Sequence, residues 1–326
     1  MYIKELKFSL WADFIERDYL DNEFKELILR GIINGATSNP AIFKNAILSS
    51  PAYKEQLSTL GGLSAKQKYE TVAIYDIQKA ADILRPLYDK GNDGYVSIEV
   101  DPFLCDDAAS TIEEGKRLYK TINRENVMIK VPATSAGYEA MEELVSDGIA
   151  VNATLVFSKE QAVSSAKAFE RGLKRSGKDV DTVISIFVSR IDRALDDILA
   201  SKGIATSLAG VYNAADIYRS IEDLHVSGCR TLFASTGVKG DNLRASYYVD
   251  ELLAFNSVNT APIDTIKAYV SGGDRSEKLP ISEQKIENLF KEIKDAGIDF
   301  DEVIRIQIED GLEAFKVAFN DIMENL

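Results

Sequence analysis

Eight short runs of apolar and β-branched residues recur along the chain, and a longer segment of helical periodicity follows each of them. This alternation is typical of repeated βα units that build a parallel sheet. The expected strands are residues 8–13, 32–38, 95–100, 127–131, 150–156, 183–188, 231–235 and 257–260. The expected helices are residues 21–29, 66–89, 110–121, 137–144, 159–176, 190–199, 214–224 and 247–253.

Eight βα units favour an α/β fold of the (β/α)8 TIM-barrel type over an open doubly wound sheet. The phosphate-binding turns typical of open sheets, Gly-x-Gly-x-x-Gly or Gly-x4-Gly-Lys-Ser/Thr, are missing from the sequence. No linker rich in Pro, Gly or Ser divides the 326 residues. We therefore expect a single barrel domain over residues 1–326, with residues 276–326 as a helical extension of it. Its acidic segment 282–326 is expected to pack outside the barrel or across its bottom, and the sequence leaves open whether its helices cover the mouth instead.

Two serines mark sharp switches from strand or loop to helix. Ser64 and Ser158 each precede a glutamine by three residues, Gln67 and Gln161. This spacing is that of a capping box, in which the two side chains satisfy free amides at the start of a helix. Both helices are therefore expected to begin at these serines.

The net charge of −14 argues against a nucleic-acid partner, because phosphates along a duplex require a basic stripe. A phosphorylated small molecule needs only one or two local cations and remains compatible with this charge. The amino terminus has no apolar signal core, and no stretch reaches the roughly 20 apolar residues of a membrane span. We expect a cytoplasmic protein with no membrane partner, and the sequence leaves its oligomeric state open, a homodimer included.

The counts of histidine and cysteine limit the chemistry. The single histidine, His225, is expected at a helix end, so metal sites and nucleophilic triads built on histidine are disfavoured. Cys105 and Cys229 lie far apart in apolar runs and are expected to be reduced and buried. Catalysis must then come from carboxylates, from lysine or from a bound cofactor.

A lysine interrupts one of the apolar strands. Lys130 lies between Ile129 and Val131, and alternation places those two toward the helices and Lys130 inside the barrel mouth. Burial disfavours the ammonium form of a lysine and so supplies the neutral amine that attacks a carbonyl. From this residue alone, a structural lysine paired with a carboxylate is an equally good interpretation.

Polar side chains at the ends of neighbouring strands favour the catalytic interpretation. Active sites of these barrels lie at the carboxyl ends of the strands, and the residues named below are all expected at those ends. Asp13 ends the first strand. Taken singly, it is better interpreted as a helix cap or a solvated turn residue. The others are the polar residues Glu99, Asn152, Thr154 and Ser185, together with the apolar Phe187, which shares a strand face with Ser185.

Cations and hydroxyls follow the last strands, where barrels of this type commonly bind phosphate. Arg190 follows the sixth strand and offers a planar fork suited to phosphate. Ser235 ends the seventh expected strand, and Lys239 lies in the loop that follows it. A glycine between them permits close approach of the backbone to a ligand. Singly each is a weak signal, but together they predict an anion site.

Five motifs in barrel order make the chain resemble the transaldolase family, in particular its longer bacterial branch. The resemblance spans residues 8–262. It is carried by Ala-Thr-Ser-Asn-Pro at 36–40, Ile-Lys-Val-Pro-Ala-Thr at 129–134, Asn-Ala-Thr-Leu-Val-Phe-Ser at 152–158, Phe-Val-Ser-Arg-Ile at 187–191 and Val-Asn-Thr at 258–260.

The resemblance implies a cofactor-free transferase of the pentose phosphate pathway that acts on sugar phosphates. Such enzymes move dihydroxyacetone from sedoheptulose 7-phosphate to glyceraldehyde 3-phosphate. Lys130 matches the family's Schiff-base lysine, Asp13 its general acid/base and Glu99 the carboxylate that works through a water, which we expect Thr154 to share. The same comparison implies that Phe187 is an apolar wall, that Arg190 and Ser235 bind phosphate, and that the fragment's hydroxyls are held by Thr37, Asn39, Asn152 and Ser185.

The chain departs from the better-known branch at two positions. Gly35 replaces an aspartate that many transaldolases have before the first motif, which leaves Asn39 in register. A longer loop replaces their Ala-Ser-Phe-Arg, so Lys239 is the expected substitute for its arginine.

Three alternatives stay open. A fructose 6-phosphate aldolase would share the lysine and the barrel, although such relatives are shorter and tend to carry a more polar residue where Phe187 stands. A metal-dependent aldolase would need several histidines. A non-enzymatic protein on a barrel frame predicts that Lys130 is an ordinary paired lysine.

Overall fold

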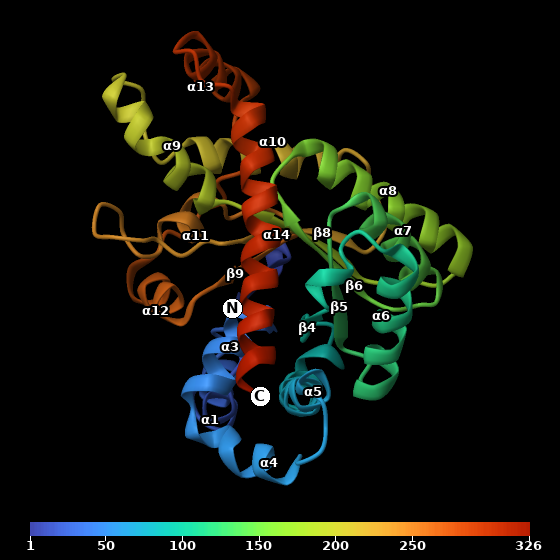
Figure 1. Ribbon diagram of the computed structural model, residues 1–326. Helices are drawn as coiled ribbons and strands as arrows, with labels where there is room; N and C mark the ends of the chain where they lie inside the picture. The colour runs from blue at the N-terminus through green and yellow to red at the C-terminus, as the bar shows by residue number, and fades with distance from the viewer.

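The computed structural model describes residues 1–326 and is built around a closed parallel barrel (Figure 1). Strands β2 to β9 follow one another around the barrel in chain order, and β9 pairs in parallel with β2 to close it. The predicted (β/α)8 fold and all eight predicted strands are thus confirmed. The barrel strands are β2 (Phe8–Ala12), β3 (Gly35–Thr37), β4 (Val96–Glu99), β5 (Val127–Pro132), β6 (Val151–Val156), β7 (Thr182–Phe187), β8 (Cys229–Ala234) and β9 (Ser257–Ala261).

One short strand lies outside this pattern. β1 (Tyr2–Ile3) pairs antiparallel with β2 and was not predicted from the sequence. Two residues are too few to show an alternating pattern, so only its pairing in the folded chain reveals it.

Helices surround the barrel, and they include every helix that the sequence predicted. The capping boxes at Ser64 and Ser158 are confirmed, with both reciprocal hydrogen bonds present. The helices are α1 (Arg17–Asp21), α2 (Glu23–Leu29), α3 (Pro40–Ser49), α4 (Lys54–Thr59), α5 (Ala65–Tyr88), α6 (Ala108–Ile122), α7 (Ser135–Ser146), α8 (Lys159–Ser176), α9 (Ser189–Ser201), α10 (Ala209–Glu222), α11 (Tyr247–Glu251), α12 (Ile263–Gly272), α13 (Glu283–Asp295) and α14 (Phe300–Asn325). Three 3-10 turns complete the set, η1 (Lys4–Leu6), η2 (Pro51–Tyr53) and η3 (Pro102–Leu104).

Helix α3 is not among the helices expected from the sequence, where the Asn-Pro pair at 39–40 indicates a loop after the second strand. Asn39 is its N-cap, and the Asn39 side chain accepts a hydrogen bond from the Ile42 amide at 3.0 Å. Pro40 occupies the first helical turn, where its missing N–H costs nothing. The two residues therefore start a helix directly at the end of β3.

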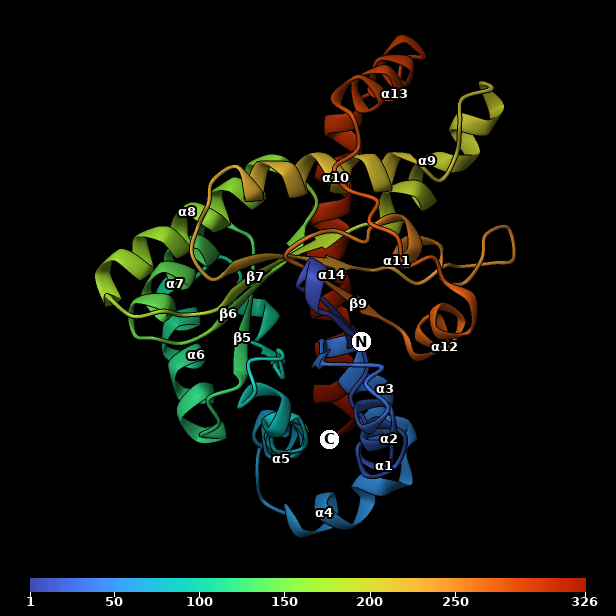
Figure 2. The same ribbon diagram turned by 180° about the vertical axis from the view of Figure 1, so that it is seen from behind.

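The first of the placements expected for the carboxyl-terminal segment does not hold for α14, which takes the position that the sequence left open. Helix α14 lies neither outside the barrel nor across its bottom, but over the carboxyl ends of the strands, and it runs in front of them in Figure 1. It contacts α3, η3 and α9, which follow β3, β4 and β7. From behind, in Figure 2, the blue amino-terminal segment lies in front and α14 behind it. Apolar periodicity showed that α14 packs on something, but not on which end of the barrel.

A glycine at the start of β3 makes room for a large ring. A Cβ at Gly35 would lie 2.6 Å from the indole of Trp11, which is fully buried in β2. The indole N–H donates to Asp93 at 2.8 Å. The departure from the family pattern at Gly35 thus has a steric reason, because any other residue would displace Trp11.

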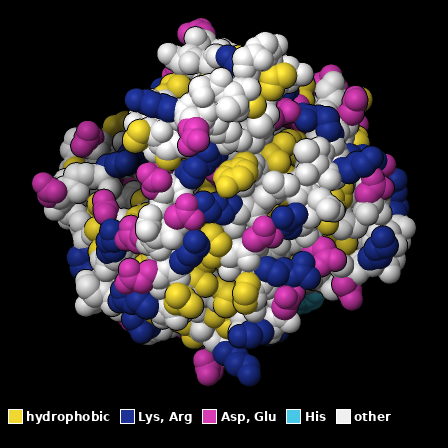
Figure 3. All heavy atoms as spheres, turned by 90° about the horizontal axis from the view of Figure 1, so that it is seen from below, with side chains coloured by type: hydrophobic (Ala, Val, Ile, Leu, Met, Phe, Trp, Pro, Cys, Tyr) yellow, Lys and Arg dark blue, Asp and Glu magenta, His cyan; other side chains and the backbone are white.

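No helix combines the length and the apolar character that a membrane span requires. Acidic and basic side chains are interspersed over the face shown in Figure 3. The exposed His225 follows α10, and both cysteines are buried and unpaired, as predicted.

Candidate active site

The three residues predicted to be catalytic lie at the carboxyl end of the barrel. Asp13 directly follows β2, Glu99 ends β4 and Lys130 lies in β5. Glu99 and Lys130 are register partners on adjacent strands, and Lys130 Nζ is 3.4 Å from Glu99 Oε2. Their side chains are only 5% and 3% exposed, so this ion pair is shielded from solvent.

Two further groups contact the Lys130 amine. Nζ donates a hydrogen bond to the backbone carbonyl of Ser38 at 3.1 Å. The ring centroid of Phe315, on α14, lies 5.7 Å from Nζ. The amine is therefore held by β3, β4 and the helix that crosses the mouth.

Asp13 accepts a short hydrogen bond from the next strand. Thr37 Oγ1 donates to Asp13 Oδ1 at 2.6 Å, and the hydroxyl of Thr260 lies 2.7 Å from that of Thr37. Because Thr37 has one proton and gives it to Asp13, Thr260 must donate to Thr37. Burial raises the pKa of Asp13, while the positive charge of Lys130 and the Thr37 hydrogen bond oppose the shift. A carboxyl group with a raised pKa is suited to proton transfer near neutral pH.

Glu99 is the second carboxyl group with a raised pKa. Burial raises its pKa to about 7, the charge of Lys130 opposes this and the charge of Asp13 adds to it. Both of its oxygens and the Thr154 hydroxyl are buried without a hydrogen-bond partner in the protein. Buried polar atoms normally have partners, so these atoms are available to a water or a substrate hydroxyl.

The amide and hydroxyl groups predicted to hold the substrate form a chain across three strands. Ser185 Oγ donates to Asn152 Oδ1 at 2.7 Å, and Asn152 Nδ2 donates to Ser97 Oγ at 3.3 Å. Asn152 is also the register partner of Lys130. Ser185, Asn152 and Lys130 thus belong to three consecutive strands of the barrel.

Strand β6 is irregular where it enters the site. Its register with β7 shifts between Ala153 and Val156, and Leu155 has a φ of 57°. A non-glycine residue with positive φ is uncommon, and bulges re-aim side chains near active sites. The irregularity directly follows Thr154, whose hydroxyl is unpartnered.

Phe187 ends β7 as an aromatic wall. It is 7% exposed, and its ring packs against Phe157 at 5.3 Å between centroids. The guanidinium of Arg190 lies 5.4 Å from the Phe187 ring centroid. Stacking of this kind restricts the Arg190 side chain and orients its fork.

The residues predicted to bind phosphate lie around the start of α9. Ser235 Oγ is 3.1 Å from Ser189 Oγ, which joins the ends of β7 and β8. Arg190 lines a cleft of about 460 Å³ between α9 and α14, whereas Lys239 lines a separate cleft of about 270 Å³ with Ser189. Arg193 lines both clefts. Neither cleft is lined by Lys130, Asp13 or Glu99.

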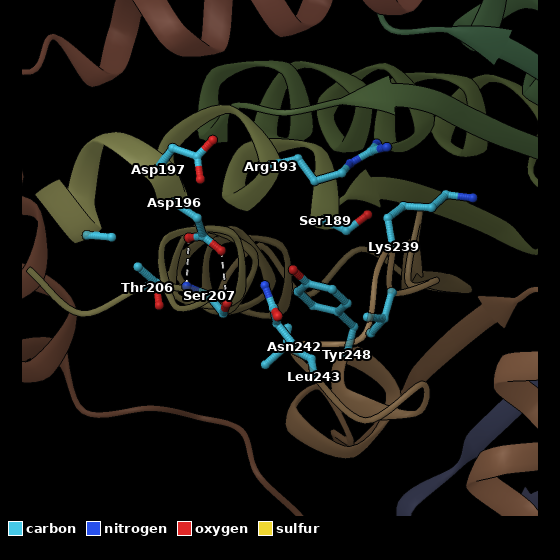
Figure 4. A pocket seen from close by; sticks show the side chains of 12 residues that line it. Ser189, Arg193, Asp196, Asp197, Thr206, Ser207, Lys239, Asn242, Leu243 and Tyr248 are labelled. Carbon is cyan, nitrogen blue, oxygen red and sulfur yellow. Dashed lines mark hydrogen bonds between the residues drawn. The ribbon is translucent and has the colours of Figure 1, made fainter.

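The smaller cleft has a basic and an acidic side. In Figure 4 Arg193, Ser189 and Lys239 lie together at one side, and Asp196 and Asp197 at the other. Asp196 is occupied by hydrogen bonds from the amide and hydroxyl of Ser207. The basic side is therefore the part of the cleft that suits a phosphate.

Neither Arg190 nor Arg193 has a carboxylate partner within salt-bridge distance, although the chain carries a net charge of −14. Burial lowers the pKa of the Arg190 guanidinium, and the charge of Arg193 adds to that effect, while Asp310 opposes it. Arg190 is partly buried and Arg193 is exposed, and two like charges this close, with no carboxylate paired to either, become more favourable beside a bound anion. This arrangement points to an anion-binding edge of the mouth.

A sequence model described as Transaldolase/Fructose-6-phosphate aldolase matches residues 10–326. The chain belongs to this family. A transaldolase from Campylobacter jejuni serotype O:23/36 is 47% identical over 330 residues, which cover 98% of this chain and 99% of the relative. A transaldolase from Helicobacter pylori strain 26695 is 43% identical over 320 residues, with the same coverage. The chain is accordingly a transaldolase-type enzyme, a transferase.

The structure brings three more residues of this transaldolase-family chain into contact with predicted site residues. Thr260 binds Thr37, Arg193 lies near Arg190, and Phe315 lies over Lys130. Thr260 stands inside the Val-Asn-Thr motif and could have been found there. Arg193 follows Arg190 by three residues in a predicted helix and could have been found from that spacing, whereas Phe315 is one more apolar residue on a helix and the sequence carried no signal for it.

Within the described chain, no group of three or more His, Cys, Asp or Glu side chains is arranged to hold a metal ion. Asn39 uses its side-chain oxygen to cap α3, which leaves its amide nitrogen for a ligand. The substrate-binding roles of the transaldolase-family residues named above stay predictions.

Proposed function

We propose that the enzyme transfers dihydroxyacetone from sedoheptulose 7-phosphate to glyceraldehyde 3-phosphate, through a Schiff base on Lys130. The products are erythrose 4-phosphate and fructose 6-phosphate, as in the non-oxidative pentose phosphate pathway. One observation carries this proposal: Lys130, a buried amine in a barrel strand, lies beside Glu99, a carboxyl group whose pKa is raised to about 7.

The amine supplies the electron sink. Lys130 attacks the ketone of the donor, and loss of water gives a protonated imine that accepts electrons better than the ketone. Breaking the bond between C3 and C4 then leaves the three-carbon unit on Nζ as an enamine. This unit adds to the aldehyde of the acceptor, and water finally releases the product.

The two carboxyl groups divide the proton transfers. Asp13 takes the proton of the C4 hydroxyl as the carbon–carbon bond breaks and returns it to the acceptor oxygen, a role that its raised pKa supports. The carboxylate oxygens of Glu99 and the hydroxyl of Thr154 are buried without a hydrogen-bond partner, which supports the proposal that they bind one water together. That water moves protons while the carbinolamine loses or gains water.

The remaining polar residues bind the substrate in this proposal. Thr37, Asn39, Asn152 and Ser185 hold the hydroxyls of the three-carbon unit, and Phe187 limits water beside it. Arg190, Ser235 and Lys239 bind the phosphate, and the position of Arg193 supports its addition to this set.

The alternative within the same family is a fructose 6-phosphate aldolase, which releases dihydroxyacetone without an acceptor. The nearly full-length match to transaldolases and the apolar side chain of Phe187 favour transfer. Incubation with fructose 6-phosphate alone distinguishes the two. Rapid net release of dihydroxyacetone would overturn the proposal in favour of the aldolase.

The covalent step is tested by borohydride reduction with fructose 6-phosphate, followed by mass spectrometry of peptides. We expect a reduced three-carbon adduct on the peptide that contains Lys130 and on no other lysine. A reaction without fructose 6-phosphate is the control. Absence of the adduct on Lys130 during turnover would contradict the Schiff-base mechanism.

The raised pKa of Glu99 predicts a pH dependence. Above about pH 7 the carboxyl group is ionised and can accept a proton, and below it the group is protonated. We therefore expect kcat/KM to fall as the pH decreases through about 7, because this parameter reports the free enzyme. Glu99→Gln should lower kcat/KM by about 100-fold or more and should lose this step. A pH profile of the variant that keeps the step would assign it to another group.

The anion-binding edge predicts a selective loss of affinity. Arg193→Gln should raise KM for fructose 6-phosphate by about 10- to 100-fold, since charge-assisted hydrogen bonds contribute roughly 1.5–3 kcal/mol. KM for unphosphorylated fructose should change little. Lys202→Gln, which removes an exposed cation just beyond α9, is the matched control. Equal effects on the two sugars would contradict a role in phosphate binding.

A further inference from the structure

We propose that Phe315 of α14 determines the outcome of the reaction: its ring keeps water from C3 of the three-carbon unit on Lys130, so that the unit is transferred and not released. The proposal rests on the Schiff base proposed above. It assigns to the carboxyl-terminal helix a role in specificity that its sequence does not indicate.

The position of Phe315 is the first observation. Its ring centroid lies 5.7 Å from Lys130 Nζ, and both residues are only 4% exposed. Any group bonded to Nζ extends one or two bond lengths from it. Atoms of the three-carbon unit on the side of Nζ that faces the ring come within van der Waals reach of it, and in the proposal that side is C3.

The close approach of α14 is the second observation. Gly311 lies one turn before Phe315, on the same face of the helix. A Cβ at Gly311 would lie 3.1 Å from Leu155 Cδ2 and 3.6 Å from Arg190 Nη1. Glycine inside a helix costs about 1 kcal/mol relative to alanine, so close packing is a reason for its presence. The missing side chain lets α14 lie directly on the mouth.

The far end of α14 is fixed as well. The ring of Phe319 packs edge-on against Tyr69, with centroids 5.4 Å apart, and also against Phe103. Asp321 forms an ion pair with Lys44 on α3 at 2.5 Å. The helix is thus anchored beyond Phe315 to elements on either side of the mouth. The ring is held in place by these contacts as well as by its own packing.

The enamine on Nζ has two possible fates. In transfer, C3 forms a bond to the aldehyde carbon of the acceptor, whose oxygen takes a proton. In release, one water is consumed: one hydrogen goes to C3, the oxygen becomes the carbonyl oxygen at C2, and the other hydrogen returns to Nζ as the C–N bond breaks. Both fates end with water at C2, because the product imine of transfer is hydrolysed as well, but only release needs a proton from water at C3. An apolar ring beside C3 therefore slows release and leaves transfer possible.

The experiment compares two phenylalanines of the same helix. Phe315→Leu and Phe319→Leu remove rings that are 4% and 5% exposed, but only the first ring lies over Lys130. The measured quantity is the rate of dihydroxyacetone release from fructose 6-phosphate alone, divided by the rate of transfer to erythrose 4-phosphate. Thermal unfolding and borohydride trapping are recorded for each variant.

We expect Phe315→Leu to raise this ratio on the order of 10-fold, through faster access of water. Phe319→Leu should leave it within about 2-fold of the wild type, with a comparable loss of stability. Phe315→Tyr keeps a ring over the amine and should also stay close to the wild-type ratio. If Phe315→Leu does not fold, Phe315→Met offers a side chain of similar volume without the rigid ring.

A wild-type ratio in both Phe315→Leu and Phe315→Met would overturn the proposal. So would an equal rise in Phe319→Leu, since the effect would then come from a loosened helix. Failure of the Schiff base itself appears differently, as the absence of a trapped adduct in the wild-type enzyme.

Discussion

Replacement of Lys130 by methionine should lower kcat/KM by about 10⁴-fold or more, because no other group in the site can form the imine. Methionine has a similar length and no amine, so it fills the same space. The reaction would lose its electron sink, and binding of the sugar would remain.

The barrel should survive this change. Lys130→Met leaves Glu99 without its cation, but burial already raises the pKa of Glu99 to about 7. In the variant we expect Glu99 to take up a proton, which avoids a buried, unpaired charge. Ser38 loses the donor to its carbonyl, a loss of about 1–3 kcal/mol if nothing replaces it.

Steady-state kinetics and circular dichroism check this prediction together. Lys66→Met is the matched control, because Lys66 is an ordinary paired lysine that binds Asp101 and Glu114. We expect its activity to stay within a few-fold of the wild type. Wild-type turnover by folded Lys130→Met would return the residue to the structural interpretation that the sequence left open.

Replacement of Asp13 by asparagine should slow the cleavage step by about 10²- to 10⁴-fold while still permitting imine formation. Asparagine keeps an oxygen that can accept the hydrogen bond from Thr37, 2.6 Å away in the wild type. It cannot take up a proton from the C4 hydroxyl. The donor should therefore accumulate on Lys130 before its carbon–carbon bond breaks.

Single-turnover release of the aldose phosphate and borohydride trapping measure these two steps separately. The trapped adduct should carry the whole donor and not only three carbons. Asp76→Asn is the control: Asp76 is likewise buried with a raised pKa, but it binds Arg17 and Tyr53 away from the mouth. Rapid cleavage in Asp13→Asn would assign the proton transfer to another residue.

The fold could be predicted because its signals are local. Apolar runs of strand length alternate with helical segments, and such alternation leaves few arrangements for a parallel sheet. Two of the misses were also local. β1 is too short for a pattern, and the Asn39-Pro40 pair begins a helix as readily as it makes a loop.

Part of the site followed from the same logic. Side chains at the carboxyl ends of parallel strands must meet at one mouth, so Asp13, Glu99 and Lys130 could be grouped from their places in the strands. The sequence did not give the direction of the proton chain from Thr260 through Thr37 to Asp13. That chain depends on distances between strands that are far apart in the sequence.

By itself, the sequence determined the barrel and the residues that its strands carry to the mouth, because strand alternation decides which side chains point inward. Only the tertiary structure decided what lies over them. Helix α14 brings Phe315 to Lys130, and it packs beside α9, where Arg190 and Arg193 line a cleft between the two helices. An apolar helix face predicts that the helix packs against another element, but not on which end of the barrel it does so. That placement depends on contacts between residues far apart in the chain, such as Gly311 against Leu155.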